Sequence, residues 1–86
     1  MPRITMKKHV IQEQEISVTL NQYVGHQLAV ARKEKKMKQR ELAKKVGYIN
    51  ISYLSLIEKG HRAVTLERLE SLCKALDCKS SDILPF

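Results

Sequence analysis

Lysines and arginines are the side chains best suited to chemistry in this 86-residue chain, and that chemistry is the neutralisation of an anionic partner. Sixteen Lys and Arg outnumber nine Asp and Glu, which gives a net charge of +7. The excess lies in residues 25–48, where eight basic side chains face two acidic ones. Because clustered cations release the counterions of nucleic-acid phosphates, nucleic acid is the expected partner. A solvated helix face is the alternative interpretation.

Residues that could catalyse a reaction or hold a metal ion are too scattered to do either. His9, His26 and His61 lie far apart, and neither an acid-pair motif nor a glycine-rich phosphate loop is present. Cys73 and Cys78 have no second pair at metal-ligand spacing, so both are expected to be thiols, with Cys73 in the core. We therefore predict no enzyme, no cofactor, no metal site and no small-molecule ligand.

The length and hydropathy of the chain limit its class further. No apolar run approaches the roughly 20 residues that span a bilayer, and no signal-peptide core is evident, which predicts a cytoplasmic protein with no membrane contact. Eighty-six residues leave room for one domain with a small core, so partner chains are expected to matter for stability.

Helical periodicity begins near Thr19, which forms a capping-box pattern with Gln22. The inward stripe of this first helix is expected to be Leu20, Val24, Leu28 and Ala31. Its opposite, solvated face is expected to carry Arg32, Lys33, Lys35 and Lys36. Met37 is expected to pack at the helix exit.

Two short helices, residues 39–45 and 51–59, follow with a tight turn between them. Gly47 should end the first helix and Asn50 should cap the second. Ala43 permits the close crossing of two helices, so this segment has the form of a DNA-reading unit.

A fourth helix should start at a Thr65 cap, and Ser80 should cap a last turn that holds Ile83 and Leu84. The inward stripe of the fourth helix is expected to be Leu66, Leu69, Leu72, Cys73 and Leu76. Residues 19–86 are thus predicted to form an all-helical bundle with short connections.

Residues 1–18 are interpreted as an N-terminal arm, either a short strand or disordered, because Ile4 and Met6 alternate with polar neighbours. One hypothesis is that Ile4, Met6 and Val10 add to a dimer by strand pairing. The alternative is a basic arm that follows DNA.

The helix-turn-helix segment resembles the Cro and phage-repressor type of regulator, also called the xenobiotic-response-element family. The resemblance extends from Val24 to Leu84 and rests on Gln39, Leu42, Ala43, Gly47, the run from Tyr53 to Gly60, and Leu66, Leu69, Cys73, Ala75, Leu76, Ile83 and Leu84. It implies an all-α, five-helix, lambda-repressor-like DNA-binding bundle. It also implies a transcriptional regulator that binds double-stranded DNA as a homodimer, on a palindromic operator.

The resemblance also implies roles for individual residues. The recognition helix would place Asn50, Ile51, Ser52, Tyr53, Ser55 and Leu56 nearest the major groove. Glu58 would have a structural role at the end of that helix. The resemblance and the nearby basic residues together give the expected phosphate contacts: Gln39, Arg40, Lys44, Lys59, His61 and Arg62. The dimer interface would use Ile83, Leu84 and Phe86.

Two departures from the family pattern affect the recognition helix. The interval from Gly47 to Glu58 is one residue longer than usual, so the turn is expected to be enlarged at Tyr48 or Ile49. Ile51 and Leu56 stand where Gln, Arg or Asn is common. Because apolar side chains form no hydrogen bonds to bases, readout is expected to use thymine methyl groups, a few polar side chains and DNA shape.

Simpler interpretations of the same residues stay open. Ser52 and Ser55 would then be solvated helix residues, Tyr53 would pack on the core, and Gln39 would only start a helix. Among regulators, the run from Gly60 to Leu66 is similar to controller proteins of restriction-modification systems, with small phage repressors and antitoxins as alternatives. The bundle could instead serve as an antitoxin or protein-interaction module, with Ile51, Tyr53 and Leu56 contacting a protein.

Overall fold

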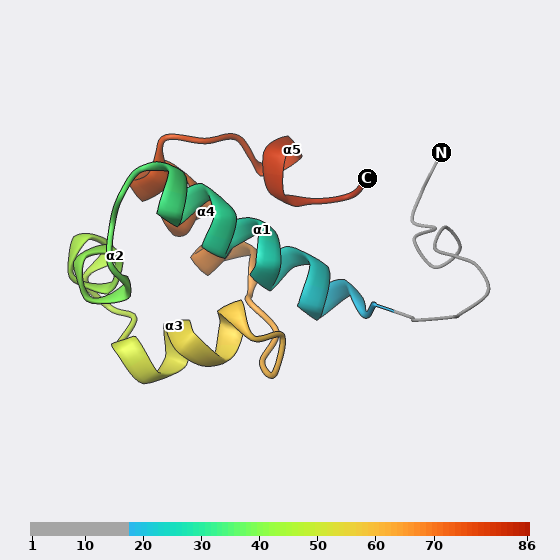
Figure 1. The fold of residues 1–86 in the computed structure, drawn as a ribbon, viewed down its shortest axis with the longest axis horizontal. Coiled ribbons are helices and arrows are strands. Elements are labelled where there is room, and N and C mark those ends of the chain that lie inside the picture. Colours follow the sequence, from blue (N-terminus) through green and yellow to red (C-terminus); the bar gives the residue numbers. More distant parts are fainter. Residues whose placement is uncertain (1–17) are drawn as a thin grey trace.

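The computed structural model describes residues 18–86 and folds them into five α-helices with short connections (Figure 1). The helices are α1 (Leu20–Glu34), α2 (Gln39–Val46), α3 (Ile51–Glu58), α4 (Leu66–Leu76) and α5 (Ser80–Ile83). No strand occurs within residues 18–86. The predicted five-helix, all-α bundle is therefore confirmed, whereas the hypothesis about Ile4, Met6 and Val10 in the arm lies outside the described residues.

The first helix, α1, begins at the predicted capping box. The Thr19 hydroxyl accepts a hydrogen bond from the Gln22 N–H (3.1 Å), and the Thr19 N–H donates to the Gln22 side-chain oxygen (3.0 Å). Val24 and Leu28 are buried on its inner face. These two bonds satisfy backbone donors that have no partner inside the helix, so they fix where α1 starts.

The expectation that Arg32 lies on the solvated face of α1 is wrong. Arg32 is buried, because it follows Leu28 by four residues and therefore continues the inward stripe of Val24 and Leu28. Its guanidinium is bonded to the carboxylate of Glu58 at the end of α3. An ion pair with a distant residue thus permits a charge at a position that periodicity assigns to the interior.

The last two helices depart from expectation at their first residues. Thr65 caps α4 as predicted, accepting a hydrogen bond from the Arg68 N–H at 3.1 Å. Leu66, however, is 80% exposed and is not part of the buried stripe. Ser80 is the first residue of α5 and not its cap. Lys79 is at the cap position, and its N–H donates a hydrogen bond to the Asp82 carboxylate (3.0 Å).

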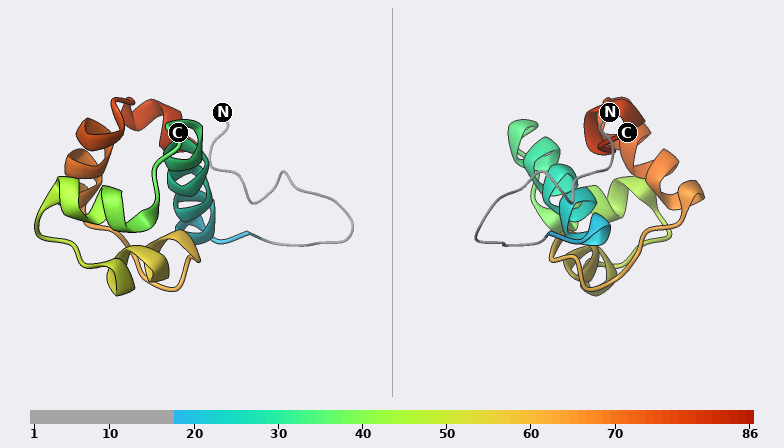
Figure 2. Two further views of the ribbon diagram at one scale, coloured as in Figure 1. Left: turned by 60° about the vertical axis from the view of Figure 1, so that its left-hand side comes forward. Right: turned by 90° about the vertical axis from the view of Figure 1, so that its right-hand side faces the viewer.

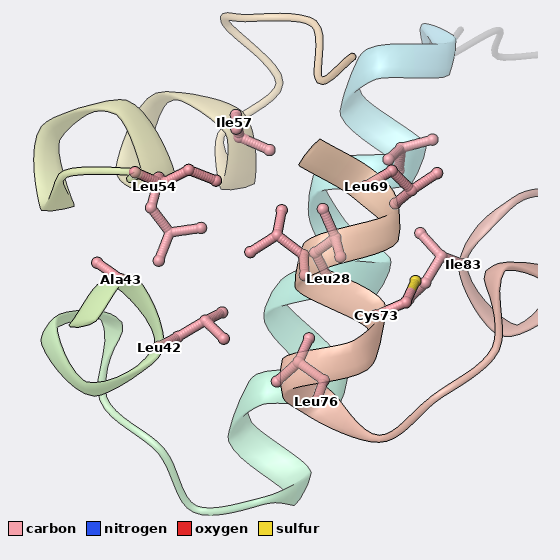
Figure 3. Packing of buried hydrophobic residues seen from close by; sticks show 12 residues of the cluster. Leu28, Leu42, Ala43, Leu54, Ile57, Leu69, Cys73, Leu76 and Ile83 are labelled. Carbon is pink, nitrogen blue, oxygen red and sulfur yellow. The ribbon is translucent and has the colours of Figure 1, made fainter. Parts of the chain in front are cut away.

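The core lies in the space that the helices enclose, and every helix contributes to it (Figure 3). Twelve hydrophobic residues are buried there: Val24, Leu28, Leu42, Ala43, Ile49, Leu54, Ile57, Leu69, Leu72, Cys73, Leu76 and Ile83. Met37, as predicted, packs against this cluster at the exit of α1. The core therefore joins the helix-turn-helix segment to α1 and α4.

The third helix, α3, packs mainly against α1 and α2, while α2 also contacts α4. In Figure 2, α2 and α3 lie next to each other on the periphery of the bundle, with α3 at its edge. One side of α3 is therefore held by two helices, and the other side faces outward.

Candidate nucleic-acid interface

The α2 and α3 helices form a compact pair joined by the four residues 47–50. Gly47 ends α2 with a φ of +96°, a conformation that residues with a Cβ rarely adopt. Asn50 caps α3, because its side-chain oxygen accepts a hydrogen bond from the Tyr53 N–H at 2.7 Å. Ala43 is buried, as the predicted close approach of the two helices requires.

The turn contains two residues whose positions the sequence did not reveal. Ile49 is buried and joins the core, so the turn is anchored from inside. Tyr48 is exposed, and its hydroxyl is hydrogen-bonded to the hydroxyl of Ser71 on α4. The segment at which an enlargement was predicted is thus attached to the bundle at two adjacent residues.

The start of α3 lies beside basic residues of α2. A shallow, open depression is lined by residues of both helices and of the turn: Arg40, Ala43, Lys44, Gly47, Ile49, Asn50, Ile51 and Ser52. Arg40, Lys44 and Ser52 are exposed there. The structure therefore brings two of the predicted phosphate-binding residues next to three of the predicted base-contacting residues.

The outward side of α3 presents both apolar and polar groups. Ile51 is 39% exposed and Leu56 is 37% exposed, whereas Ser55 is half-buried. Neither exposed aliphatic side chain contributes to the core of the bundle. This outward side is therefore available to a partner, and Ser52 is its most accessible predicted hydrogen-bonding side chain apart from Asn50.

Tyr53 is half-buried and is held by other parts of the protein. Its hydroxyl donates to the Ala63 carbonyl oxygen (3.2 Å) and accepts from Arg68 Nη1 (2.9 Å). The guanidinium of Arg68 lies 4.8 Å from the ring centroid, and that of Arg62 lies 5.5 Å from it. These contacts match the alternative interpretation, in which the ring packs against the protein. They also order the loop after α3.

The far end of α3 carries the other predicted phosphate contacts. Lys59, His61 and Arg62 are exposed in the residues that follow the helix, while Arg40 and Lys44 lie near its start. Because basic residues occur near both ends of α3, a phosphate backbone on either side of the helix would meet positive charge.

Gln39 is positioned differently from the other predicted phosphate contacts. It is half-buried, and its side-chain Nε2 donates to Glu58 Oε1 at 2.9 Å. It therefore braces Glu58, the last residue of α3. One of its two amide hydrogens is used inside the protein.

Glu58 is the centre of the bond network that fixes α3. Arg32 donates two hydrogen bonds to its carboxylate, at 2.7 Å and 3.0 Å, and a third to the Met37 carbonyl oxygen at 2.8 Å. With Gln39, these residues join the end of α1, the start of α2 and the end of α3. The predicted structural role of Glu58 is confirmed, and these bonds hold the end of α3 against α1 and α2.

The expected dimer residues occupy three different environments. Ile83 is only 1% exposed and belongs to the core of the bundle, Leu84 is half-buried, and Phe86 is 70% exposed. An apolar groove beside them is lined by Leu84, Phe86 and Leu66 among others. Ile83 can therefore only support such a surface from beneath.

No group of three or more metal-ligating side chains occurs within the described residues. Cys73 and Cys78 are free thiols. Burial raises the pKa of Cys73 to about 12 and also raises the pKa of Cys78, so both are protonated at neutral pH. No helix of residues 18–86 is long and apolar enough to cross a membrane.

Comparisons with known proteins agree with this geometry. The helix-turn-helix family profile HTH_3 matches residues 28–83. An uncharacterized HTH-type transcriptional regulator of Bacillus subtilis (strain 168), YozG, is 41% identical over 54 residues, which are 62% of this chain and 63% of that protein. The match thus spans less than two thirds of that relative's length.

Solved structures of two proteins are similar in both fold and sequence. Two structures of the clp gene regulator ClgR from Corynebacterium glutamicum superimpose with a TM-score of 0.73 and 34% identity, over 76% of this chain and 82% or 68% of the ClgR chain. The restriction-modification controller protein C.AhdI from Aeromonas hydrophila gives a TM-score of 0.71 and 30% identity, over 74% of this chain and 96% of its own. With a family match over most of its length and a fold shared with these regulators, the chain belongs to the helix-turn-helix (HTH_3) family of the Cro/C1 type.

Proposed function

We propose that this protein is a sequence-specific, double-stranded-DNA-binding transcriptional regulator that places α3 in the major groove. The observation that carries the proposal is the outward side of α3. The Arg32–Glu58 pair holds this helix from within, and basic residues lie near both of its ends. A rigid helix with phosphate-binding groups beside it meets the two requirements of groove recognition, positioning and readout.

Direct readout would come from Asn50, Ile51, Ser52, Ser55 and Leu56. The Asn50 oxygen caps α3, so its amide group would be the part that donates to a base. Ile51 and Leu56 suit thymine methyl groups, which are apolar features of the major groove. We place Tyr53 beside the phosphate backbone at most, because its hydroxyl is bonded within the protein.

The phosphate contacts would be Arg40 and Lys44 on one side of α3, and Lys59, His61 and Arg62 on the other. All five side chains are exposed. Gln39 would contribute through its remaining amide hydrogen while it holds Glu58.

The regulator would act as a homodimer on a palindromic operator, with half-sites about one helical turn apart. Residues 19–86 would form the DNA-binding domain, and residues 1–18 would form an arm. Support for self-association comes from the exposed side chain of Phe86, which lies beside the half-buried Leu84 near the buried Ile83. Isolated large apolar patches on small proteins mark interaction sites.

Within the regulators, we propose a controller protein of a restriction-modification system, acting in the cytoplasm without catalysis. The similarity to the controller C.AhdI supports this class, as does the run from Gly60 to Leu66. The class would be tested by mapping bound sites in the source genome. Sites beside restriction-enzyme or methyltransferase genes are expected, and their absence there would reject the class while leaving DNA binding intact.

A second candidate is a protein-interaction module, including an antitoxin, that uses the same side of α3. The observation that favours it is the exposure of the aliphatic side chains Ile51 and Leu56. Such a surface would bind a protein through apolar contacts, so its affinity would change little with salt. DNA affinity, in contrast, falls steeply with salt.

The first experiment measures binding to a random duplex by fluorescence anisotropy over a range of salt concentrations. We expect binding at low salt and a loss of affinity of about 10³-fold or more between 50 and 200 mM salt if six or more phosphates are neutralised. Absence of binding to any duplex at low salt would overturn the proposed function.

The second experiment tests the reading residues by selecting bound sites from a random DNA pool. Ser52→Ala is expected to change the preferred sequence. At one base-pair position, the variant should lose about 1–3 kcal/mol of discrimination between the preferred base and the others. Ser81→Ala, an exposed serine on α5, is the matched control and should preserve the preference. An unchanged preference for Ser52→Ala would overturn this placement of the reading residues.

A further inference from the structure

An apolar groove of about 180 Å³ lies between the start of α1, the start of α4 and the end of the chain. Its apolar lining includes Leu20, Val24, Leu66, Leu69, Leu84 and Phe86. Three of these, Leu20, Leu66 and Phe86, are among the large hydrophobic side chains that the bundle leaves exposed. Exposed apolar side chains gathered at one groove indicate that something covers it.

The groove continues into an acidic hollow, although the protein as a whole is strongly basic. Leu66, Leu69 and Leu84 line this second hollow together with Glu67 and Glu70. Both carboxylates are exposed. Within the described residues, the ion pair of Glu70 is with Lys74 at 3.7 Å, and Glu67 takes part in none. Among residues 18–86, Arg62 is the one charged residue that lines the apolar groove, whereas the charged residues of the second hollow are both acidic. A segment that fits this surface would therefore place apolar side chains in the groove and basic side chains beside Glu67 and Glu70.

The first part of the chain has this composition. Residues 3–11 combine apolar and basic side chains: Arg3, Ile4, Met6, Lys7, Lys8, Val10 and Ile11. Residues 12–17 connect this stretch to Val18, the first described residue, which precedes the groove residue Leu20 by two positions. A tether of seven residues reaches about 23 Å when extended, so residues 3–11 reach the groove from there.

We propose that residues 3–11 lie in this groove of their own chain. Ile4, Met6 and Val10 or Ile11 pack on Leu66 and Phe86, and the basic side chains lie beside Glu67 and Glu70. The short tether favours the same chain over another copy, because it gives the segment an effective concentration in the millimolar range. The proposal goes beyond the proposed function and does not depend on DNA binding. It places the arm on Leu84 and Phe86, the side chains that also support the proposed homodimer, so any such dimer would form with the arm in place.

The test is photo-crosslinking of the free, full-length protein. p-Benzoylphenylalanine replaces Leu66, and unlabelled and ¹⁵N-labelled chains are mixed, allowed to exchange, irradiated and analysed by mass spectrometry. The proposal predicts adducts to residues 3–11 in which both peptides carry the same isotope. Mixed-isotope adducts would overturn it in favour of a second copy, and so would the absence of any adduct to residues 3–11.

Two arm variants refine the test without altering the helices. Ile4→Asp/Met6→Asp is expected to lower the adduct yield about tenfold, because two apolar side chains leave the groove. Gln12→Asp/Gln14→Asp adds the same charge to the polar part of the arm and should keep the yield. Equal yields in both variants would overturn the proposal. Anisotropy with duplex DNA, measured in parallel, reports separately on the proposed function.

Discussion

At the residue scale, the position of α3 depends on one buried ion pair. The side chains of Arg32 and Glu58 are only 10% and 6% exposed, and the Gln39 amide completes the network. Removing one partner of a buried pair leaves the other charge uncompensated, which costs about 3–5 kcal/mol. We expect Glu58→Gln, which preserves shape, to lower the free energy of unfolding by about 3 kcal/mol in a urea titration.

The matched control is Glu70→Gln on α4. Glu70 lies 3.7 Å from Lys74 in an ion pair that is open to solvent. Exposed pairs of this kind contribute little, so the free energy of unfolding should change by less than about 0.5 kcal/mol. An equal loss of stability in both variants would contradict the assigned role of the Arg32–Glu58 pair.

Cys73 makes stability depend on pH at the alkaline end. Burial, followed by the influence of Cys78 and Asp82, raises its pKa from 9.0 to about 12. The folded state therefore holds this proton more tightly than the unfolded state. The resulting contribution to stability is complete below pH 9 and is lost as the pH rises towards 12.

The measurement is the urea midpoint at pH 9 and at higher pH, for the natural chain and for Cys73→Ala. We expect the midpoint of the natural chain to decrease over this interval by more than that of the variant. An identical decrease would mean that other groups cause the alkaline loss of stability.

At the scale of elements, α1 and α3 approach each other through a position that has no side chain. A Cβ added to Gly25 would lie 2.0 Å from the Ile57 carbonyl oxygen and 2.9 Å from that of Glu58. Alanine within a helix is ordinarily more stable than glycine by about 0.5–1 kcal/mol. At Gly25 the clash with backbone atoms makes alanine the less stable residue, because α3 must move away from α1.

We expect Gly25→Ala to destabilise the protein by about 1–3 kcal/mol, as overpacking does, in thermal unfolding followed by circular dichroism. Gly47→Ala is the comparison, because no atom lies within 4 Å of the added Cβ and only the positive φ opposes it. A Gly25→Ala variant more stable than the natural chain would refute the close contact of α1 with α3.

At the scale of the whole molecule, the uneven distribution of charge makes DNA affinity depend on a few side chains. The net charge is +7, yet residues 49–86 carry five basic and five acidic groups. The excess therefore lies earlier, where α2 places Arg40 and Lys44 beside the start of α3. Each phosphate contact contributes about one unit to the salt dependence of binding.

Arg40→Gln should weaken binding to all duplexes alike and reduce the slope of log affinity against log salt by about 1. Lys74→Gln removes the same charge from α4, where the side chain is paired with Glu70, and should leave the slope unchanged. Equal slope changes in both variants would show that only net charge matters, and not the location of Arg40.

Sequence alone determined the helices and most of their ends, with the Ser80 cap as an exception, because these ends depend on bonds between residues three or four apart. Thr19 with Gln22, Asn50 with Tyr53, and Gly47 with its positive φ were all predictable in this way. Of the site, the sequence located the helix-turn-helix and the structural role of Glu58. The contacts of its individual residues with DNA stay predictions.

Tertiary structure decided which side chains those helices bury and which they leave free. Arg32 is inside because a carboxylate 26 residues away neutralises it, and Tyr53 is turned toward Arg68 by a bond across 15 residues. Ile49 is buried and Leu66 exposed, although hydrophobicity alone would not separate them. Such outcomes depend on packing between elements that lie far apart in the chain, and local periodicity contains no information about these partners.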